Sequence, residues 1–93
     1  MRAAFLSDLE RRLIEVDGIA EGLRRGVVRD DEARAALLAQ MHDIKGCAAP
    51  YGVPEATVVA RGYERQLSQQ PPNSAAIGIL LAELIRDFRR IFA

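Results

Sequence analysis

Apolar residues recur every three or four positions along four segments of this 93-residue sequence, and clusters of glycine, proline and acidic residues separate the segments. This spacing places the apolar side chains of each segment on one face of an α-helix. No segment alternates apolar and polar residues cleanly with the period of two that a half-buried strand requires. We therefore predict an all-α fold.

Turn-forming and capping residues indicate where the first two helices start and end. The first helix is expected over Ala3 to about Arg25, and the second over about Asp31 to Ala49. Asp30 or Asp31 is the expected N-cap of the second helix, because a side-chain carboxylate there can accept from the first backbone N–H groups. Pro50 ends this helix, since proline cannot donate the intrahelical hydrogen bond.

Prolines also delimit the third and fourth helices. Pro54 fits the first turn of the third helix, where its missing N–H costs nothing, and Gln69-Gln70-Pro71-Pro72 interrupts that helix. Asn73 or Ser74 is the expected cap of the fourth helix. Four amphipathic helices with short connections favour a single domain over residues 1–93, folded as an antiparallel up-down four-helix bundle.

The expected core consists of the apolar stripe of each helix. In chain order its members are Phe5, Leu9, Leu13, Val16, Ala20 and Leu23; Leu37, Met41, Ile44 and Ala48; Val58 or Val59, Tyr63 and Leu67; and Ile77, Leu81, Leu84, Phe88 and Ile91.

The charge balance and the scarcity of cysteine and histidine exclude several classes of function. Thirteen Lys and Arg residues balance thirteen Asp and Glu residues, so no bulk field attracts nucleic acid or an anionic membrane. One Cys and one His exclude a disulfide framework and an intrachain zinc site built from these residues alone. No apolar run approaches the roughly 20 residues that span a bilayer. We expect a cytoplasmic protein without a metal or a cofactor of its own.

His42 is the residue most suggestive of chemistry. Helical geometry places it about 130° away from the mean direction of the second helix's apolar stripe, so it is expected to point into solvent. Leu38, Lys45, Gly46 and Ala49 lie on the same side of the helix. An exposed glycine within a helix costs about 1 kcal/mol relative to alanine. Gly46 therefore suggests that a Cβ would obstruct something approaching the imidazole, or else relieves crowding against a neighbouring helix.

The stretch from His42 to Gly52, HDIKGCAAPYG, resembles the signature of histidine-containing phosphotransfer (HPt) domains. In that family the histidine is followed by an aliphatic residue at +2, Lys-Gly at +3 and +4, small residues, and a second glycine at +10. The segment Val59–Glu64 is similar to the family's apolar-Ala-Arg-x-apolar-Glu pattern. The resemblance covers about a quarter of the chain, and the family's four-helix bundle agrees with the helices expected here.

The resemblance implies a phosphorelay intermediate that carries a phosphoryl group between aspartates of receiver domains. His42 is then the phospho-acceptor and Lys45 offsets charge on the phosphoryl oxygens. Glu64 occupies the position where a carboxylate can hydrogen-bond imidazole Nδ1–H and leave Nε2 available. Gly46 gives clearance to the partner, and Leu38, Ala49 and Arg61 are candidate docking residues.

The expected partners are response-regulator receiver domains and a hybrid or cognate histidine kinase. Magnesium is expected on the receiver, and the chain itself is expected to be a monomeric carrier without autonomous enzymatic activity. Two residues depart from the family pattern: Pro50 falls within the usual helical continuation, so that the helix can end early, and Asp43 is not a family hallmark.

Other interpretations of these residues remain open. The chain can instead be a non-catalytic module that docks on a receiver or a kinase without accepting phosphate. Glu64 can be an ordinary surface carboxylate, and Gly52 is expected to be a turn residue with positive φ. Cys47 lies about 140° around the helix from His42, so it is expected to be a partly buried apolar residue and not a catalytic partner.

Overall fold

The computed structural model describes residues 2–48, 50, 52–69 and 74–92. Within these ranges the chain forms four α-helices and no strand: α1 (Arg2–Arg24), α2 (Asp30–Ala48), α3 (Pro54–Gln69) and α4 (Ser74–Arg89). A 3-10 turn, η1 (Arg90–Phe92), follows α4. The all-α prediction is confirmed.

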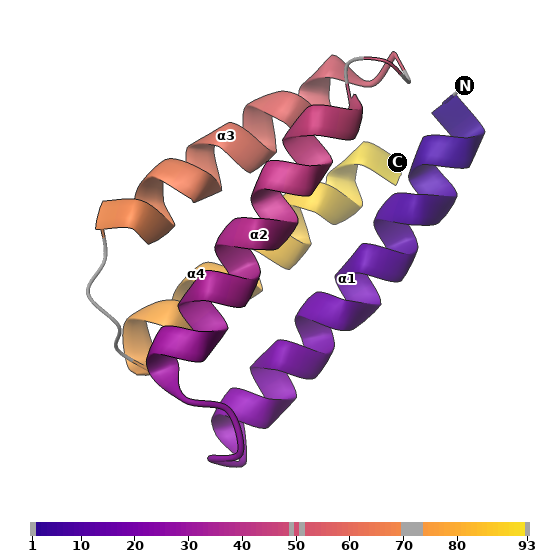
Figure 1. Ribbon diagram of the computed structural model, residues 1–93. Coiled ribbons are helices and arrows are strands. Elements are labelled where there is room, and N and C mark those ends of the chain that lie inside the picture. Colours follow the sequence, from indigo (N-terminus) through magenta and orange to yellow (C-terminus); the bar gives the residue numbers. More distant parts are fainter. Residues whose placement is uncertain (1, 49, 51, 70–73, 93) are drawn as a thin grey trace.

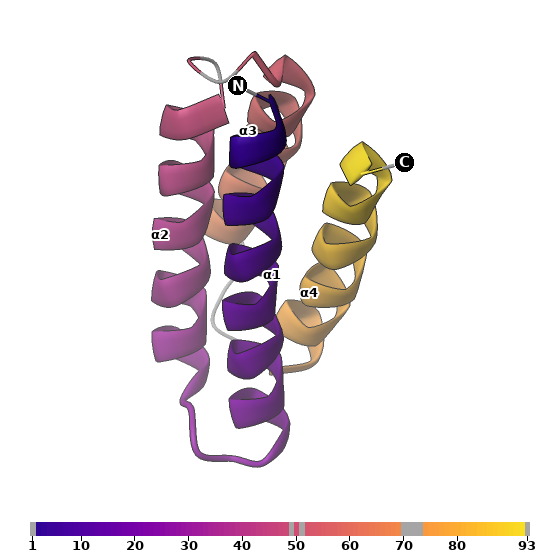
Figure 2. The ribbon, with the colours of Figure 1, turned by 90° about the vertical axis from the view of Figure 1, so that its right-hand side faces the viewer.

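The helices are arranged side by side along the long dimension of the molecule. In Figure 1, α1 descends from the N-terminus, α2 rises, α3 descends and α4 rises toward the C-terminus. Figure 2 shows α2 and α4 on opposite sides of α1. The most extensive packing between helices joins α2 to α3, so these two helices form one closely packed half of the domain.

The described turns between helices follow the sequence prediction with one correction, and Asn73, a candidate cap of α4, lies outside the described residues. Gly26 and Gly52 have φ values of 76° and 74°, a region that favours glycine, so the turn role expected for Gly52 is confirmed. The N-cap of α2 is Arg29, and neither Asp30 nor Asp31. The Arg29 carbonyl accepts from Ala33 N–H at 2.9 Å, and the Glu32 carboxylate accepts from Arg29 N–H at 3.3 Å. The acidic residues lie in the first turn of α2, where their negative charges interact favourably with the positive end of the helix dipole.

The core matches the predicted stripes at most positions. Of the predicted residues Ala20, Leu23, Val59 and Ile91 are partly buried, whereas Val58 is 69% exposed. Among the described residues, five buried apolar side chains were not predicted: Ala33, Val53, Ala56, Ala60 and Leu80. Most of them are small residues, which let helices approach closely but give a weak hydrophobic signal in a sequence.

A side chain from α2 holds the end of α3. Arg34 Nε donates to the Leu67 carbonyl at 2.7 Å, and Arg34 Nη2 donates to the Ser68 carbonyl at 3.0 Å. The last carbonyls of a helix lack intrahelical donors, and a cation there also suits the helix dipole. Arg34 therefore fixes the register between α2 and α3.

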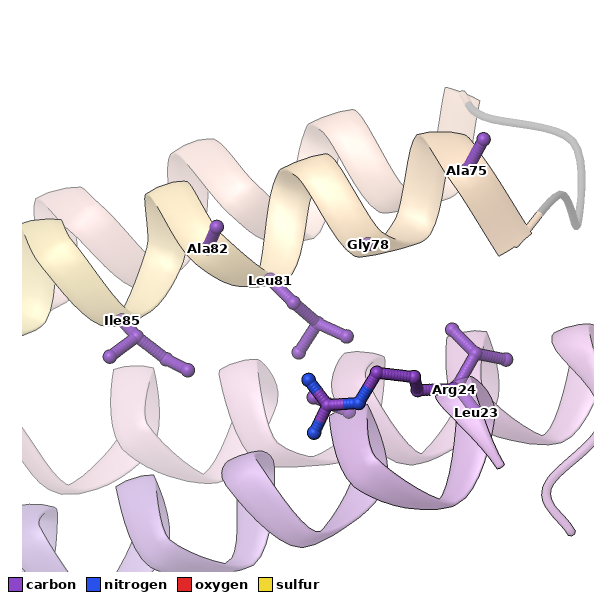
Figure 3. Close-up of a pocket in the computed structure, with 8 residues that line it drawn as sticks. Leu23, Arg24, Ala75, Gly78, Leu81, Ala82 and Ile85 are labelled. Carbon is purple, nitrogen blue, oxygen red and sulfur yellow. The ribbon is translucent and has the colours of Figure 1, made fainter. Parts of the chain in front are cut away.

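The other side of the domain is packed more openly. A groove of about 640 Å³ separates the C-terminal part of α1 from the N-terminal part of α4. Its lining is apolar apart from Arg24, and Figure 3 shows Leu81 and Ile85 pointing from α4 toward α1. None of the residues that line it belongs to α2 or α3.

Candidate functional site

His42 projects from α2 into solvent. Its side chain is 73% exposed, as its position away from the apolar stripe predicts. Its neighbours Met41 and Ile44 are fully buried and anchor this turn of α2 in the core. The imidazole is therefore carried by a rigid backbone and is accessible to another protein.

Lys45 and Glu64 meet beside the imidazole. Lys45 Nζ donates to Glu64 Oε1 at 2.7 Å, and the other carboxylate oxygen, Oε2, lies 3.8 Å from His42 Nδ1. The Lys45 and Glu64 side chains are 31% and 26% exposed. The structure thus brings together the three residues that the sequence analysis selected as His42 and its partners.

The contact between Glu64 and the imidazole differs from the expected hydrogen bond. A separation of 3.8 Å is longer than a hydrogen bond, so the interaction is electrostatic at this distance. The carboxylate approaches Nδ1, which is the nitrogen expected to carry the proton when Nε2 acts as nucleophile. Lys45 is the closer partner of Glu64, and its hydrogen bond occupies the other carboxylate oxygen, Oε1.

The surroundings of Glu64 favour its ionised form. The hydrogen bond from Lys45 is the largest influence and lowers the pKa of the Glu64 carboxyl, and desolvation opposes it. The charges of Lys45, His42 and Arg61 lower this pKa further. Glu64 is therefore an anion placed between an ammonium group and a titratable ring.

Gly46 leaves open space one turn beyond His42 on α2, and Gly62 is a second open glycine, on α3. A Cβ added at Gly46 or at Gly62 meets no heavy atom within 4 Å apart from its chain neighbours and the local backbone of its own helix. The structure contradicts the alternative explanation of Gly46 as relief of crowding against a neighbouring helix. Gly62 on α3 was missed as a surface feature, although the same signal, an exposed glycine within a helix, was present in the sequence.

The candidate docking residues have different environments. Arg61 is exposed, whereas Leu38 is partly buried and packs against the core, so Leu38 offers less apolar surface than expected. Ala49 lies outside the described residues. Val58, considered a candidate core residue in the sequence, is exposed one turn before Gly62 and adds an apolar contact surface on α3.

A polar network that was not predicted ties α1 to the turn that bears His42. The Arg12 guanidinium donates to Asp8 at 2.9 Å and to Gln40 at 3.1 Å, and it lies 3.5 Å from the carboxylate of Asp43. The Arg12 side chain is only 16% exposed. Asp43, the departure from the family pattern, thus has a structural partner.

Cys47 is partly buried and packs against the core, as predicted for a small apolar residue. Among the residues that the structure describes, no three His, Cys, Asp or Glu side chains are grouped to hold a metal ion. Within the same ranges, no helix has the length and apolar character needed to cross a bilayer.

Comparison with known protein families, with curated proteins and with solved structures finds no match to this chain.

Proposed function

We propose that this chain is a histidine phosphotransfer protein that relays phosphoryl groups between receiver-domain aspartates through phosphohistidine at His42. The fold in this proposal is an antiparallel up-down four-helix bundle of the HPt type. One observation carries it: a 73% exposed imidazole lies beside an ammonium–carboxylate pair on a helix whose next turn carries a glycine with open space around it.

This surface offers the nucleophile and one cation that phosphoryl transfer from a receiver requires. The Nε2 lone pair attacks phosphorus in line, and the bond from phosphorus to the receiver's aspartyl oxygen breaks, with its electron pair leaving on the carboxylate. Lys45 is close enough in the helix to offset charge on the phosphoryl oxygens. Magnesium on the receiver completes the charge stabilisation, and the reverse reaction loads a second receiver.

The exposure of His42 supports a carrier and not an autonomous enzyme. A surface imidazole does not exclude water by itself, whereas phosphoryl transfer benefits from a closed site. A docked receiver would close the site by covering His42 and the open position at Gly46. Arg61, one turn before Glu64 on α3, supplies positive charge at this surface, which suits a small, transient interface.

The partners of the proposed relay are cytoplasmic response-regulator receiver domains and the hybrid or cognate histidine kinase that loads them. The carrier acts as a monomer in this scheme. Neither a nucleotide nor a metal ion bound to this chain takes part in the step.

A transfer screen against phosphorylated receiver domains tests the proposal. We expect at least one receiver to transfer acid-labile, base-stable label to the native chain and none to His42→Gln. The control variant Asp17→Asn changes an exposed residue of α1 and should accept label as the native chain does. Equal labelling of the native chain and His42→Gln would reject the assignment of His42.

The same screen distinguishes the non-catalytic docking module. In that case a receiver or a kinase binds the chain without transferring phosphate, and His42→Ala leaves its affinity unchanged. Circular dichroism of each variant shows whether helix content is preserved.

A further inference from the structure

The charged groups of the site compete for one carboxylate. Glu64 accepts a hydrogen bond from Lys45 at 2.7 Å, while its second oxygen lies 3.8 Å from His42 Nδ1. Arg61, one turn earlier on α3, also attracts this carboxylate. Before phosphorylation the Lys45 ammonium is therefore the principal partner of Glu64, and the imidazole is the secondary one.

Phosphoryl transfer changes the charges around Glu64. When Nε2 forms its bond to phosphorus and the aspartyl carboxylate leaves with the electron pair of the broken P–O bond, Nδ1 retains its proton. The ring, neutral before attack, becomes cationic, and a dianionic phosphoryl group now lies on Nε2. Besides Arg61, the site then holds two cations, the ring and Lys45, and two anions, Glu64 and the phosphoryl group.

Geometry determines how these charges pair best. Lys45 is three residues beyond His42 on the same helix, so its ammonium can reach the imidazole's substituent as well as α3. Glu64 already faces Nδ1, the ring nitrogen that does not attack phosphorus. If Lys45 stayed on Glu64, the carboxylate would serve both cations and the phosphoryl group would have no ammonium partner from this chain's triad.

We propose that phosphorylation of His42 transfers Lys45 from Glu64 to the phosphoryl group, while Glu64 closes its contact with Nδ1–H. This inference rests on the proposed function and adds a mechanism to its site. Glu64 is a positioning residue: it holds the Lys45 ammonium beside the unphosphorylated imidazole, and after phosphorylation it stabilises the cationic ring.

NMR of the Lys45 side chain tests the exchange without a receiver. Potassium phosphoramidate serves as the phosphoryl donor, and the ¹⁵Nζ resonance of Lys45, assigned with Lys45→Ala, is followed in the native chain, in Glu64→Gln and in Glu10→Gln. Glu10 is an exposed acid of α1, so the last variant removes the same charge elsewhere.

We expect Glu64→Gln, but not Glu10→Gln, to shift the resonance in the unphosphorylated protein. Phosphorylation should shift it in the native chain and bring it to the position seen in phosphorylated Glu64→Gln. A Lys45 resonance unmoved by phosphorylation would overturn the exchange, and so would an equal effect of Glu64→Gln in both states or a His42 that accepts no phosphoryl group.

The outcome separates this inference from the relay itself. Receiver transfer with a fixed Lys45 resonance rejects the exchange and keeps the relay. A shift with phosphoramidate, without transfer from any receiver, keeps the exchange and rejects the relay.

Discussion

The α2–α3 pair and the α1–α4 pair differ in how closely their helices pack. Between α2 and α3, buried alanines such as Ala56 and Ala60 allow close contact, and Arg34 ties the end of α3 to α2. Between α1 and α4, an apolar groove of about 640 Å³ remains open. The close pair carries the charged site on its surface, and the open pair carries none of the site residues.

The site requires a fixed arrangement of α2 and α3. Glu64 reaches Lys45 and His42 across the interface between α2 and α3, so a shift between these helices would change both distances. Small residues and polar ties are suited to that task, because interiors of closely packed helices have little room to adjust. The α1–α4 pair contributes stability without that constraint.

Removal of the buried aromatic side chain that anchors α4 should destabilise the fold most. Phe88 is fully buried, and Phe88→Ala should lower the free energy of unfolding by about 3–5 kcal/mol because a cavity remains. Phe92, which is 37% exposed, provides the matched control. Urea denaturation measures both variants, and similar losses for the two would show that α4 is not anchored as described.

A matched pair of enlargements tests the contrast between the halves directly. Ala60→Leu should lower the free energy of unfolding by about 1–3 kcal/mol, because Ala60 is fully buried and has no space to expand. Ala82→Leu, in the groove, should be tolerated or stabilising, because Ala82 is exposed and lines open space. Thermal unfolding that ranks the two variants in the opposite order would contradict the contrast.

A buried hydroxyl connects the two halves. Tyr63 of α3 donates to Asp87 of α4 at 2.5 Å, and this hydrogen bond lowers the pKa of Asp87. Burial, followed by the effect of Asp87, raises the pKa of Tyr63. Tyr63→Phe should lower the free energy of unfolding by about 1–2 kcal/mol through loss of the bond. An unchanged urea midpoint would show that the contact contributes nothing in solution.

Two open glycines give a smaller effect that separates stability from function. Gly46→Ala and Gly78→Ala should each raise the free energy of unfolding by about 1 kcal/mol, because alanine favours the helix and the added Cβ meets no heavy atom within 4 Å beyond its chain neighbours and the local helix backbone. Receiver transfer should slow in Gly46→Ala and remain unchanged in Gly78→Ala. Slowing of transfer by both variants to the same degree would remove the clearance argument for Gly46.

The smallest effect is a pH dependence at Glu64. Its pKa is lowered in the folded chain, chiefly by the hydrogen bond from Lys45, so its contribution to stability is present above the ordinary carboxyl pKa of about 4.3. That contribution is lost as the pH falls through the lower folded value. The stability difference between the native chain and Glu64→Gln should therefore disappear in acid. A difference that grows as the pH falls would reverse the assigned sign.

The sequence predicted the helices because their stripes are long and regular, and it predicted the exposure of His42 from one helical angle. It missed Ala56 and Ala60, whose small side chains give little hydrophobic signal, and it left Val58 and Val59 as alternatives because adjacent valines fit a stripe equally well. The pairing of Lys45 with Glu64 depends on the rotation of α3 against α2, which no spacing within one helix reveals.

Mapping the phosphoryl group on the chain is the decisive test of His42 as the phospho-acceptor. After incubation with a phosphorylated receiver and magnesium, ³¹P NMR should show one phosphoramidate resonance, and peptide mass spectrometry should place one phosphoryl group on His42. A phosphoryl group on any other residue, or a chain that remains unmodified by every receiver that binds it, would contradict the account.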